Sequence, residues 1–398
     1  MPSRVQTLVA DRLPEPLLDA VRSARRRYWR ARAPFSPAPA APARPVVRPD
    51  SPVRALIGPA NFAGQAWAWA KAAQEHLDGV ETTVMSVAGG LAFPTDYLVP
   101  LPAYRSPRWQ REQEQWVTGT FTHVLIDAMR SLFGSRYAAN AAGDLPVLTR
   151  AGITVGLIAH GSDIRVGSRH RELYEWSPWK DESWAHGRRL ETQARRLGAA
   201  MNAYAGPRFV STPDLLDFAP GATWLPVVVD PGRWTSTRAL LERERPIVLH
   251  VPTNPELKGS RHVDAQLQPL HDAGLIEYRR LQGIAPDEMP AVVAESDIVV
   301  DQLVLGLYSV MAVQAMAAGR VVVAHVADRV RARIGQELPI AEATPADLAS
   351  VIESLVAERD ASRALAARGT AYAHEVHDGR RSAGVLAPFF DRPLHAAA

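Results

Sequence analysis

Residues 248–260 read VLHVPTNPELKGS, and they show the pattern on which the rest of the sequence is built. An apolar run breaks into a proline-punctuated loop, and the loop ends in Lys258-Gly259 before a segment with helical spacing. A strand that leads through a loop into a helix is one step of a parallel sheet. The unpaired N–H groups at the start of such a helix favour an anion, and Lys258 adds a positive charge. The stretch therefore predicts an anion site at the end of a parallel strand.

The same alternation of apolar runs and amphipathic stretches extends through both halves of the chain. Strands are predicted at 53–57, 82–85, 123–126, 153–158 and 209–212, and again at 247–251, 276–279, 298–301 and 321–324. Amphipathic stretches such as Val263–Ala273 and Met311–Ala318 separate the later runs. Strands joined by helical crossovers predict an α/β protein with two doubly wound, Rossmann-like parallel-sheet domains that face each other across a cleft.

The expected domain boundaries follow from this pattern. The first domain is predicted at 50–235 and the second at 236–375, with the connection near 232–243. A carboxyl-terminal segment, 376–398, is expected to cross back onto the first domain. The pattern restarts once, and no shorter internal repeat is present in the sequence.

The amino-terminal residues 1–49 form a basic arm. They hold ten arginines against three acidic residues, a net charge of about +7, whereas the whole chain carries +3. Helical apolar spacing between Pro16 and Tyr28 gives way to a Pro/Ala-rich linker. Two interpretations stay open: a solvated arm that packs on its own body or on a partner, and an amphipathic helix on an anionic membrane surface.

Composition excludes several classes of protein. Without cysteine the chain forms no disulfide, thiolate metal site or cysteine nucleophile. No run reaches the roughly 18–20 apolar residues of a membrane span, and the amino terminus lacks the apolar centre of a secretion signal. We expect a cytoplasmic protein, with peripheral contact at the inner membrane face as the alternative for the arm. No nucleic-acid motif, G-x-G-x-x-G fingerprint or P-loop occurs, so neither nucleic acid nor a dinucleotide cofactor is expected.

Each half offers a ligand site where a strand meets a helix. In the first half the stretch 57–69 supplies Gly58, Asn61, Gly64 and Gln65, although a plain tight turn accounts for these residues equally well. In the second half Ser309 is a suitable helix N-cap, so the amides of Ser309 and Val310 are expected to face an anion opposite Lys258. A lone lysine at a helix start is more often only solvated, so the prediction rests on the two features occurring together.

Three stretches resemble the retaining, nucleotide-sugar-dependent glycosyltransferases of the GT-B fold. They are VLHVPTNPELKGS (248–260), DIVVDQLVLGLYSVMAVQAMAAGR (297–320) and, earlier in the chain, LIAHGSDIR (157–165). The family in question is the large one related to sucrose and mannosyl transferases. The likeness spans about residues 54–373, and it is strongest in the second half.

The resemblance implies a metal-independent and cofactor-independent transfer of a sugar from a nucleoside diphosphate to a hydroxyl acceptor, either lipid-linked or a glycan. It implies that Lys258 neutralises the diphosphate, that His160 faces the donor sugar and that Asp163 orients it. The structural alternative is that His160 closes the strand end while Asp163 bonds local amides. The implied donor site comprises Thr253, Asn254, Lys258, Gly259, Arg261, Tyr308, Ser309, Val310 and Gln314. Gly58, Asn61, Gly64 and Gln65 would face the acceptor or the phosphates.

Three positions depart from the family pattern. Gln314 stands where members commonly carry a ribose-binding glutamate, Gly306 replaces a second glutamate, and Thr253 replaces an arginine for which Arg261 is the substitute offered by the sequence. These departures keep a second hypothesis open, a catalytically silent protein that binds sugar nucleotides or glycans. A third, an epimerase, would need a carboxylate pair that the sequence does not mark.

Three tryptophans, Trp176, Trp179 and Trp184, lie close together in one first-half insertion. Indole rings stack well on a sugar face or on a lipid-linked acceptor. The alternative is burial against neighbouring helices, which is the commoner fate of tryptophan.

Overall fold

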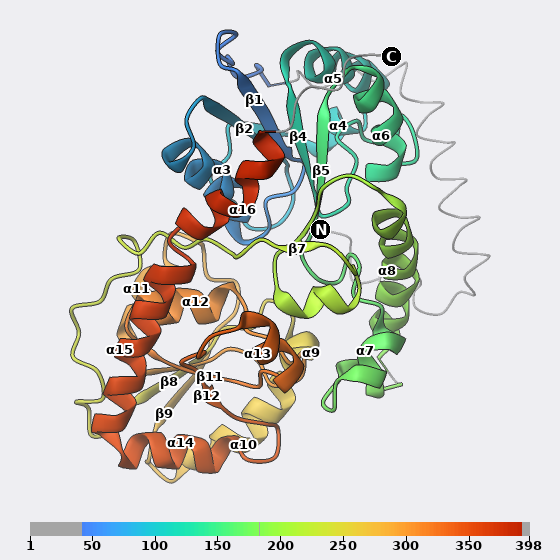
Figure 1. The fold of residues 1–398 in the computed structure, drawn as a ribbon. Coiled ribbons are helices and arrows are strands. Elements are labelled where there is room, and N and C mark those ends of the chain that lie inside the picture. The colour runs from blue at the N-terminus through green and yellow to red at the C-terminus, as the bar shows by residue number, and fades with distance from the viewer. Residues whose placement is uncertain (1–41, 183, 392–398) are drawn as a thin grey trace.

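The computed structural model describes residues 42–182 and 184–391, which form two α/β lobes stacked one above the other (Figure 1). The predicted amphipathic part of the basic arm and the last seven residues lie outside the described residues. Among the residues that are described, no helix is both long and apolar enough to cross a membrane.

The first lobe is built on a seven-stranded parallel sheet with the order β3-β2-β1-β4-β5-β6-β7. Its strands are β1 Val53–Gly58, β2 Val80–Val87, β3 Tyr97–Val99, β4 His123–Asp127, β5 Thr154–Ala159, β6 Arg208–Val210 and β7 Thr223–Trp224. The helices on its faces are α3 Gln65–His76, α4 Leu101–Tyr104, α5 Pro107–Thr120, α6 Ala141–Arg150, α7 Gly167–Leu173 and α8 Ala185–Ala203. Short 3-10 turns occur at Phe62–Gly64, Pro178–Lys180 and Pro213–Asp217.

The second lobe is built on a five-stranded parallel sheet with the order β12-β11-β10-β8-β9. Its strands are β8 Ile247–His250, β9 Glu277–Arg280, β10 Ile298–Val300, β11 Val321–Ala324 and β12 Ala341–Glu342. Its helices are α9 Pro255–Lys258, α10 Ser260–Asp272, α11 Met289–Glu295, α12 Val310–Ala317, α13 Asp328–Ile334, α14 Leu348–Ala357 and α15 Arg359–Val376.

Both sheets have a hydrophobic core on each face, which is why their strands read as continuous apolar runs. In β1, Leu56 packs into one core while Ala55 and Ile57 pack into the other. The two-lobed parallel-sheet fold class predicted from these runs is confirmed. Each of the nine predicted apolar runs contains a strand, displaced by no more than two residues at either end.

The last helix, α16 (Arg380–Phe390), connects the lobes. The chain passes from α15 on the second lobe to α16, which lies against the first lobe (Figure 1). The Phe389 ring lies 6.1 Å from that of Phe209 and 5.4 Å from that of His123. Direct contacts also join the lobes, among them an ion pair of 2.6 Å between Arg333 and Asp217. The carboxyl ends of both sheets consequently lie at the junction between the lobes.

Candidate functional site

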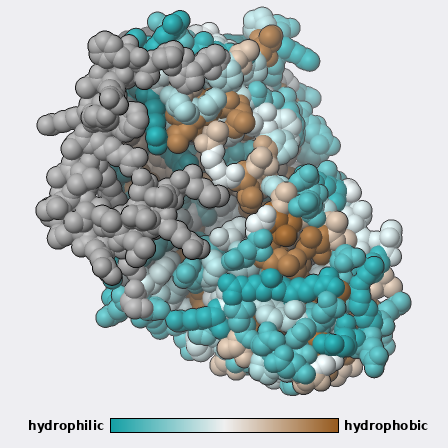
Figure 2. All heavy atoms as spheres, turned by 180° about the vertical axis from the view of Figure 1, so that it is seen from behind, coloured by the Kyte–Doolittle hydropathy of each residue, from teal (hydrophilic) through white to brown (hydrophobic). Residues whose placement is uncertain are grey.

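A cleft of about 650 Å3 lies between the lobes. One wall consists of α3 and the loop that follows β2, and the other consists of α11, α12 and the loop after β8. The connection 228–234 closes one side. Seen from behind, apolar side chains gather where the upper and lower lobes meet (Figure 2). Such a position, outside the carboxyl ends of parallel strands, is where open α/β sheets hold ligands.

Lys258 enters the cleft at the end of α9. Its Nζ lies 2.6 Å from Asp301 Oδ1 and 2.8 Å from Ser309 Oγ. Gly259 follows in the left-handed region at φ +70, and a Cβ on it would lie 2.8 Å from Val304 Cγ1, so the close approach of this turn to the next loop requires glycine. An ammonium has three N–H donors. Because two are engaged, Lys258 is fixed in place with one donor left for a ligand.

The start of α12 requires a correction to the predicted anion clamp. The Ser309 amide donates to Asp301 Oδ2 over 2.8 Å, so this amide does not face a ligand. The next two amides, of Val310 and Met311, have no hydrogen-bond acceptor within the described chain. The N–H groups that can face an anion at the positive end of the helix dipole are therefore those of Val310 and Met311.

Two further predicted donor residues line the cleft. Gln314 lies one turn along α12, and its side chain makes no hydrogen bond to any described residue. Thr253 is exposed in the loop after β8. Asn254 is used within the protein, because its Oδ1 accepts from Leu257 N over 3.2 Å and caps α9.

Arg261 and Tyr308 do not reach the cleft. Arg261 points to the other side of α9, where its Nη1 donates to Asp181 Oδ2 over 3.0 Å, so it does not replace the arginine absent at Thr253. Tyr308 is buried, and its hydroxyl lies 3.1 Å from Tyr372 Oη and 3.2 Å from His377 Nε2. Burial raises the pKa of Tyr308 well above its usual value, which keeps this hydroxyl neutral.

Gly306 stands where the sequence resemblance implies a glutamate, and the structure leaves no room for that side chain. Its φ is +69, and a Cβ at this position would lie 2.7 Å from a ring atom of Tyr174 in the first lobe. The surrounding loop is apolar and buried, and Leu305 and Leu307 pack against Trp179. This loop thus serves contact between the lobes.

In the first lobe the predicted ligand loop is satisfied by its own chain. Asn61 Oδ1 accepts from Trp67 N at 3.2 Å, and a Cβ on Gly58 would lie 2.6 Å from a backbone oxygen of β2. The buried Gln65 amide accepts from Val228 N at 2.7 Å and donates to Val228 O at 3.0 Å. Gly64 and Gln65 line the cleft, whereas Gly58 and Asn61 do not. The turn interpretation fits this loop, because its polar groups hold α3 and the connection in place.

His160 and Asp163 are close together but are not among the residues that line the cleft. His160 Nε2 is hydrogen-bonded to Asp127, and the imidazole stacks on Trp69 with 5.5 Å between ring centres. Asp163 accepts from the amides of His160, Gly161 and Ile164 at 2.8, 2.7 and 3.0 Å. The carboxylate of Asp163 therefore closes a turn, as the structural alternative predicted.

Asp127 was not singled out from the sequence. It is fully buried at the end of β4, beside β5, which leads into His160. Burial of the imidazole opposes its protonation, but the Asp127 carboxylate outweighs this and raises the pKa of His160. Asp127 could have been identified from the sequence. Asp127 and His160 each end an apolar run, and the residues that end two neighbouring parallel strands lie close together.

Other cleft residues were also missed. Trp67, Lys71 and Glu75 recur every four residues on one face of α3, and all three line the cleft. Lys71 Nζ lies 4.2 Å from the centre of the Trp67 ring. Arg233 reaches in from the connection and donates to Pro286 O over 2.8 Å. The spacing on α3 was the detectable signal.

Within residues 42–182 and 184–391, no group of three or more His, Asp or Glu side chains is placed to hold a metal ion.

No protein-family model matches the sequence, and no curated protein matches it. Solved structures do resemble it. Sucrose-phosphate synthase from Thermosynechococcus elongatus superposes with a TM-score of 0.58 at 13% identity, over 85% of this chain and 98% of the other. HepE from Anabaena, in complex with UDP and glucose, gives 0.56 at 14% identity, over 84% and 98%. The chain has the GT-B fold.

WaaG, a glycosyltransferase involved in lipopolysaccharide biosynthesis, is a further match, with a TM-score of 0.50 at 11% identity over 86% of this chain and 100% of WaaG. At these identities the likeness concerns the arrangement of the two GT-B lobes. It is the contacts within the cleft that bear on chemistry.

Proposed function

We propose that this protein transfers a sugar from a nucleoside diphosphate sugar to a hydroxyl acceptor, with retention at the anomeric carbon. The observation that carries the proposal is the setting of Lys258. Its ammonium is held by Asp301 and Ser309 in an interlobe cleft, beside the open amides at the start of α12. The UDP and glucose found with HepE support this class of donor.

The chemistry follows from where charge develops. As the bond between the sugar and the diphosphate breaks, negative charge grows on the departing phosphate. The free N–H of Lys258 and the amides of Val310 and Met311 are positioned to receive that charge. Their positions are fixed beforehand, so little reorganisation is needed during the reaction. On this account neither a metal nor a separate general base is required, because the phosphate accepts the acceptor's proton.

The other residues that line the cleft assign one wall to the donor and the other wall to the acceptor. Gln314 donates to or accepts from the ribose hydroxyls as a neutral amide. Trp67, Lys71 and Glu75 on α3 face the acceptor, which we propose to be a glycan or a lipid-linked hydroxyl. Contact of the arm 1–49 with an anionic membrane would suit the latter. Vesicle co-sedimentation of the protein with and without residues 1–49 tests this contact, which equal binding of both forms would disprove.

The donor site can be tested by lysine labelling, since the chain has only three lysines, Lys71, Lys180 and Lys258. We expect UDP, GDP, ADP or TDP, alone or as the sugar conjugate, to protect Lys258 from an amine reagent read by mass spectrometry. The exposed Lys180 is the internal control. A ligand at 100 times its dissociation constant should also stabilise the fold by about 2.7 kcal/mol. Unchanged labelling of Lys258 with every nucleotide would contradict the proposal.

A variant separates binding from catalysis. Lys258→Ala alone leaves the buried Asp301 carboxylate unpaired, which destabilises the fold. The double variant Lys258→Met/Asp301→Asn removes both charges, and we expect it to bind nucleotide about tenfold to a hundredfold more weakly, as for a lost charge-assisted hydrogen bond. Slow hydrolysis of the donor should be lost with it, while Lys180→Ala behaves as wild type. Protection of Lys258 without any hydrolysis or transfer would indicate the catalytically silent protein instead.

A further inference from the structure

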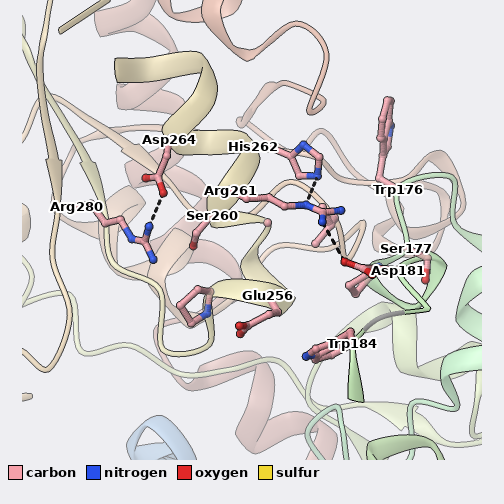
Figure 3. Close-up of a pocket in the computed structure, with 14 residues that line it drawn as sticks. Trp176, Ser177, Asp181, Trp184, Glu256, Ser260, Arg261, His262, Asp264 and Arg280 are labelled. Carbon is pink, nitrogen blue, oxygen red and sulfur yellow. Dashed lines mark hydrogen bonds and ion pairs between the residues drawn. The ribbon is translucent and has the colours of Figure 1, made fainter. Parts of the chain in front are cut away.

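A second pocket, of about 450 Å3, is lined by other residues of α9 than the cleft, and Figure 3 shows the side chains around it. One wall is the first-lobe insertion that includes Trp176 and Trp184, and the other is formed by α9 and the first turn of α10. Within α9, Lys258 lines the cleft whereas Glu256 lines this pocket. The pocket therefore shares a wall with the donor site but opens elsewhere.

The three tryptophans of the insertion have two different environments. Trp179 is buried, packs against Leu305 and Leu307, and donates its N–H to Gly187 O over 3.2 Å. Trp176 and Trp184 are half-buried and line the pocket. Burial accounts for Trp179, whereas Trp176 and Trp184 pack against hydrophobic cores and keep the rest of their surface open to the pocket.

Polar groups surround these rings. The ion pair between Arg261 and Asp181 crosses the pocket from one lobe to the other, and Arg280 pairs with Asp264 (Figure 3). The Glu256 carboxylate has no ion-pair or hydrogen-bond partner in the part of the chain that the structure describes. The pocket thus offers an open acceptor and, on Arg261, N–H donors beyond those bound to Asp181 and His262.

The balance of charge distinguishes this pocket from an anion site. Two guanidinium groups, of Arg261 and Arg280, stand against three carboxylates, of Asp181, Glu256 and Asp264. Burial and the neighbouring Arg261 lower the pKa of His262, so this imidazole is neutral at pH 7. A phosphate would meet net negative charge here. Flat apolar rings rimmed by two ion pairs, a neutral imidazole and one open carboxylate instead match a ring that is apolar on its faces and carries hydroxyls at its edge.

We propose that this pocket binds a saccharide, as a second carbohydrate site separate from the donor cleft. A pyranose ring stacks on Trp184 or Trp176, and its hydroxyls donate to Glu256 and accept from Arg261. The volume suits one or two sugar units. The inference rests on this pocket alone, so it holds whether or not the cleft takes a nucleotide sugar.

Ligand-observed saturation-transfer NMR on the full chain tests the proposal. The probes are methyl glucoside, methyl galactoside, methyl mannoside, maltotriose and cellotriose, each without nucleotide. We expect at least one to bind, and Trp184→Ala to weaken it about threefold to tenfold, as for a lost stacking partner. Trp184→Phe should recover part of the affinity. Tyr137→Ala, which removes an exposed aromatic ring of the first lobe remote from the pocket, is the matched control.

Further measurements distinguish loss of saccharide binding from loss of folding, and this pocket from the donor cleft. Trp184 packs on Trp179, so the exposed Arg261→Ala serves as a second variant that keeps the core, and it should also weaken binding. Saturating UDP and the double variant Lys258→Met/Asp301→Asn should both leave saccharide binding unchanged. Displacement by UDP, insensitivity to both pocket variants, or binding by none of the five probes would overturn the proposal.

Discussion

The two lobes present the same architectural feature, a helix that starts at the carboxyl end of a sheet, and they use it differently. At the start of α3 the polar groups are consumed internally, since Gln65 binds both backbone groups of Val228 and Asn61 binds Trp67 N. At the start of α12 the amides of Val310 and Met311 stay open beside Lys258.

The difference shows that the position in the fold does not by itself make a binding site. What distinguishes the second lobe is that its buried acid, Asp301, engages both donors of Ser309 but only one of the three donors of Lys258. Lys258, Val310 and Met311, which keep open N–H groups, all line the cleft. In the first lobe the equivalent groups connect α3 to the segment between the lobes, which is a structural task.

The largest expected effect is that of Gly306→Glu, which introduces the glutamate that the resemblance noted in the sequence implies next to α12. The left-handed backbone costs a non-glycine residue about 1–2 kcal/mol, and collision with Tyr174 adds about 1–3 kcal/mol. We therefore expect the free energy of unfolding, measured in urea, to fall by about 2–5 kcal/mol. Gly274→Glu is the matched control, because Gly274 has φ +78 and no atom within 4 Å of the added Cβ. An equal loss for both variants would exclude the contact with Tyr174 as a cause.

Gln65→Leu tests the structural role of the first lobe's loop. The substitution leaves the N–H and C=O of Val228 buried without partners, which should lower the free energy of unfolding by about 2–4 kcal/mol. Gln115→Leu, on the exposed side of α5, is the control and should change stability by less than about 0.5 kcal/mol. Similar stability of the two variants would mean that Gln65 is available to a ligand after all.

How much of the fold the sequence could predict depends on where each strand lies in its sheet. Eight of the nine predicted strands lie inside a sheet, and β9 is the one predicted edge strand, whereas the three strands that were not predicted, β3, β7 and β12, are edge strands of two or three residues with no apolar run. Thr223–Trp224 becomes a strand because it pairs with β6, and that pairing is tertiary. Short strands of this kind carry no periodic signal.

Some residues of the candidate site could likewise be predicted from the sequence and others could not. Lys258 and the start of α12 were predicted together because each follows an apolar run at the start of a helix, and the structure pairs these two runs as the strands β8 and β10. The directions of Arg261 and Tyr308 could not be predicted. They depend on Asp181 and His377, which are 80 and 69 residues away in the chain.

The Asp127–His160 pair gives a pH-dependent test in the first lobe. The pKa of His160 is raised in the folded state, so the stability that the pair contributes is complete below the unfolded pKa of about 6.5 and is lost as the pH rises through the folded pKa. Asp163 supports the charged imidazole and Arg130 opposes it. Each unit of raised pKa corresponds to about 1.4 kcal/mol.

We expect Asp127→Asn to lose more stability, relative to wild type, at pH 5.5 than at pH 9, measured as urea midpoints across this range. Asp78→Asn changes the same charge on an exposed side chain, and its difference from wild type should not vary with pH in this way. A difference for Asp127→Asn that is flat or grows with pH would show that His160 is neutral throughout.

The smallest expected effect concerns Gln314, which lies one turn along α12 from the open amides. If the cleft holds a ribose there, Gln314→Glu replaces a neutral acceptor by a carboxylate and should tighten nucleotide binding by about 1 kcal/mol, or about fivefold, since charge-assisted hydrogen bonds are the stronger. The gain should vanish for the 2′,3′-dideoxy nucleotide, which lacks both hydroxyls, when the two are compared by isothermal titration calorimetry. Weaker binding of both nucleotides would mean that the new carboxylate faces the diphosphate, which would reverse the orientation proposed for the donor along α12.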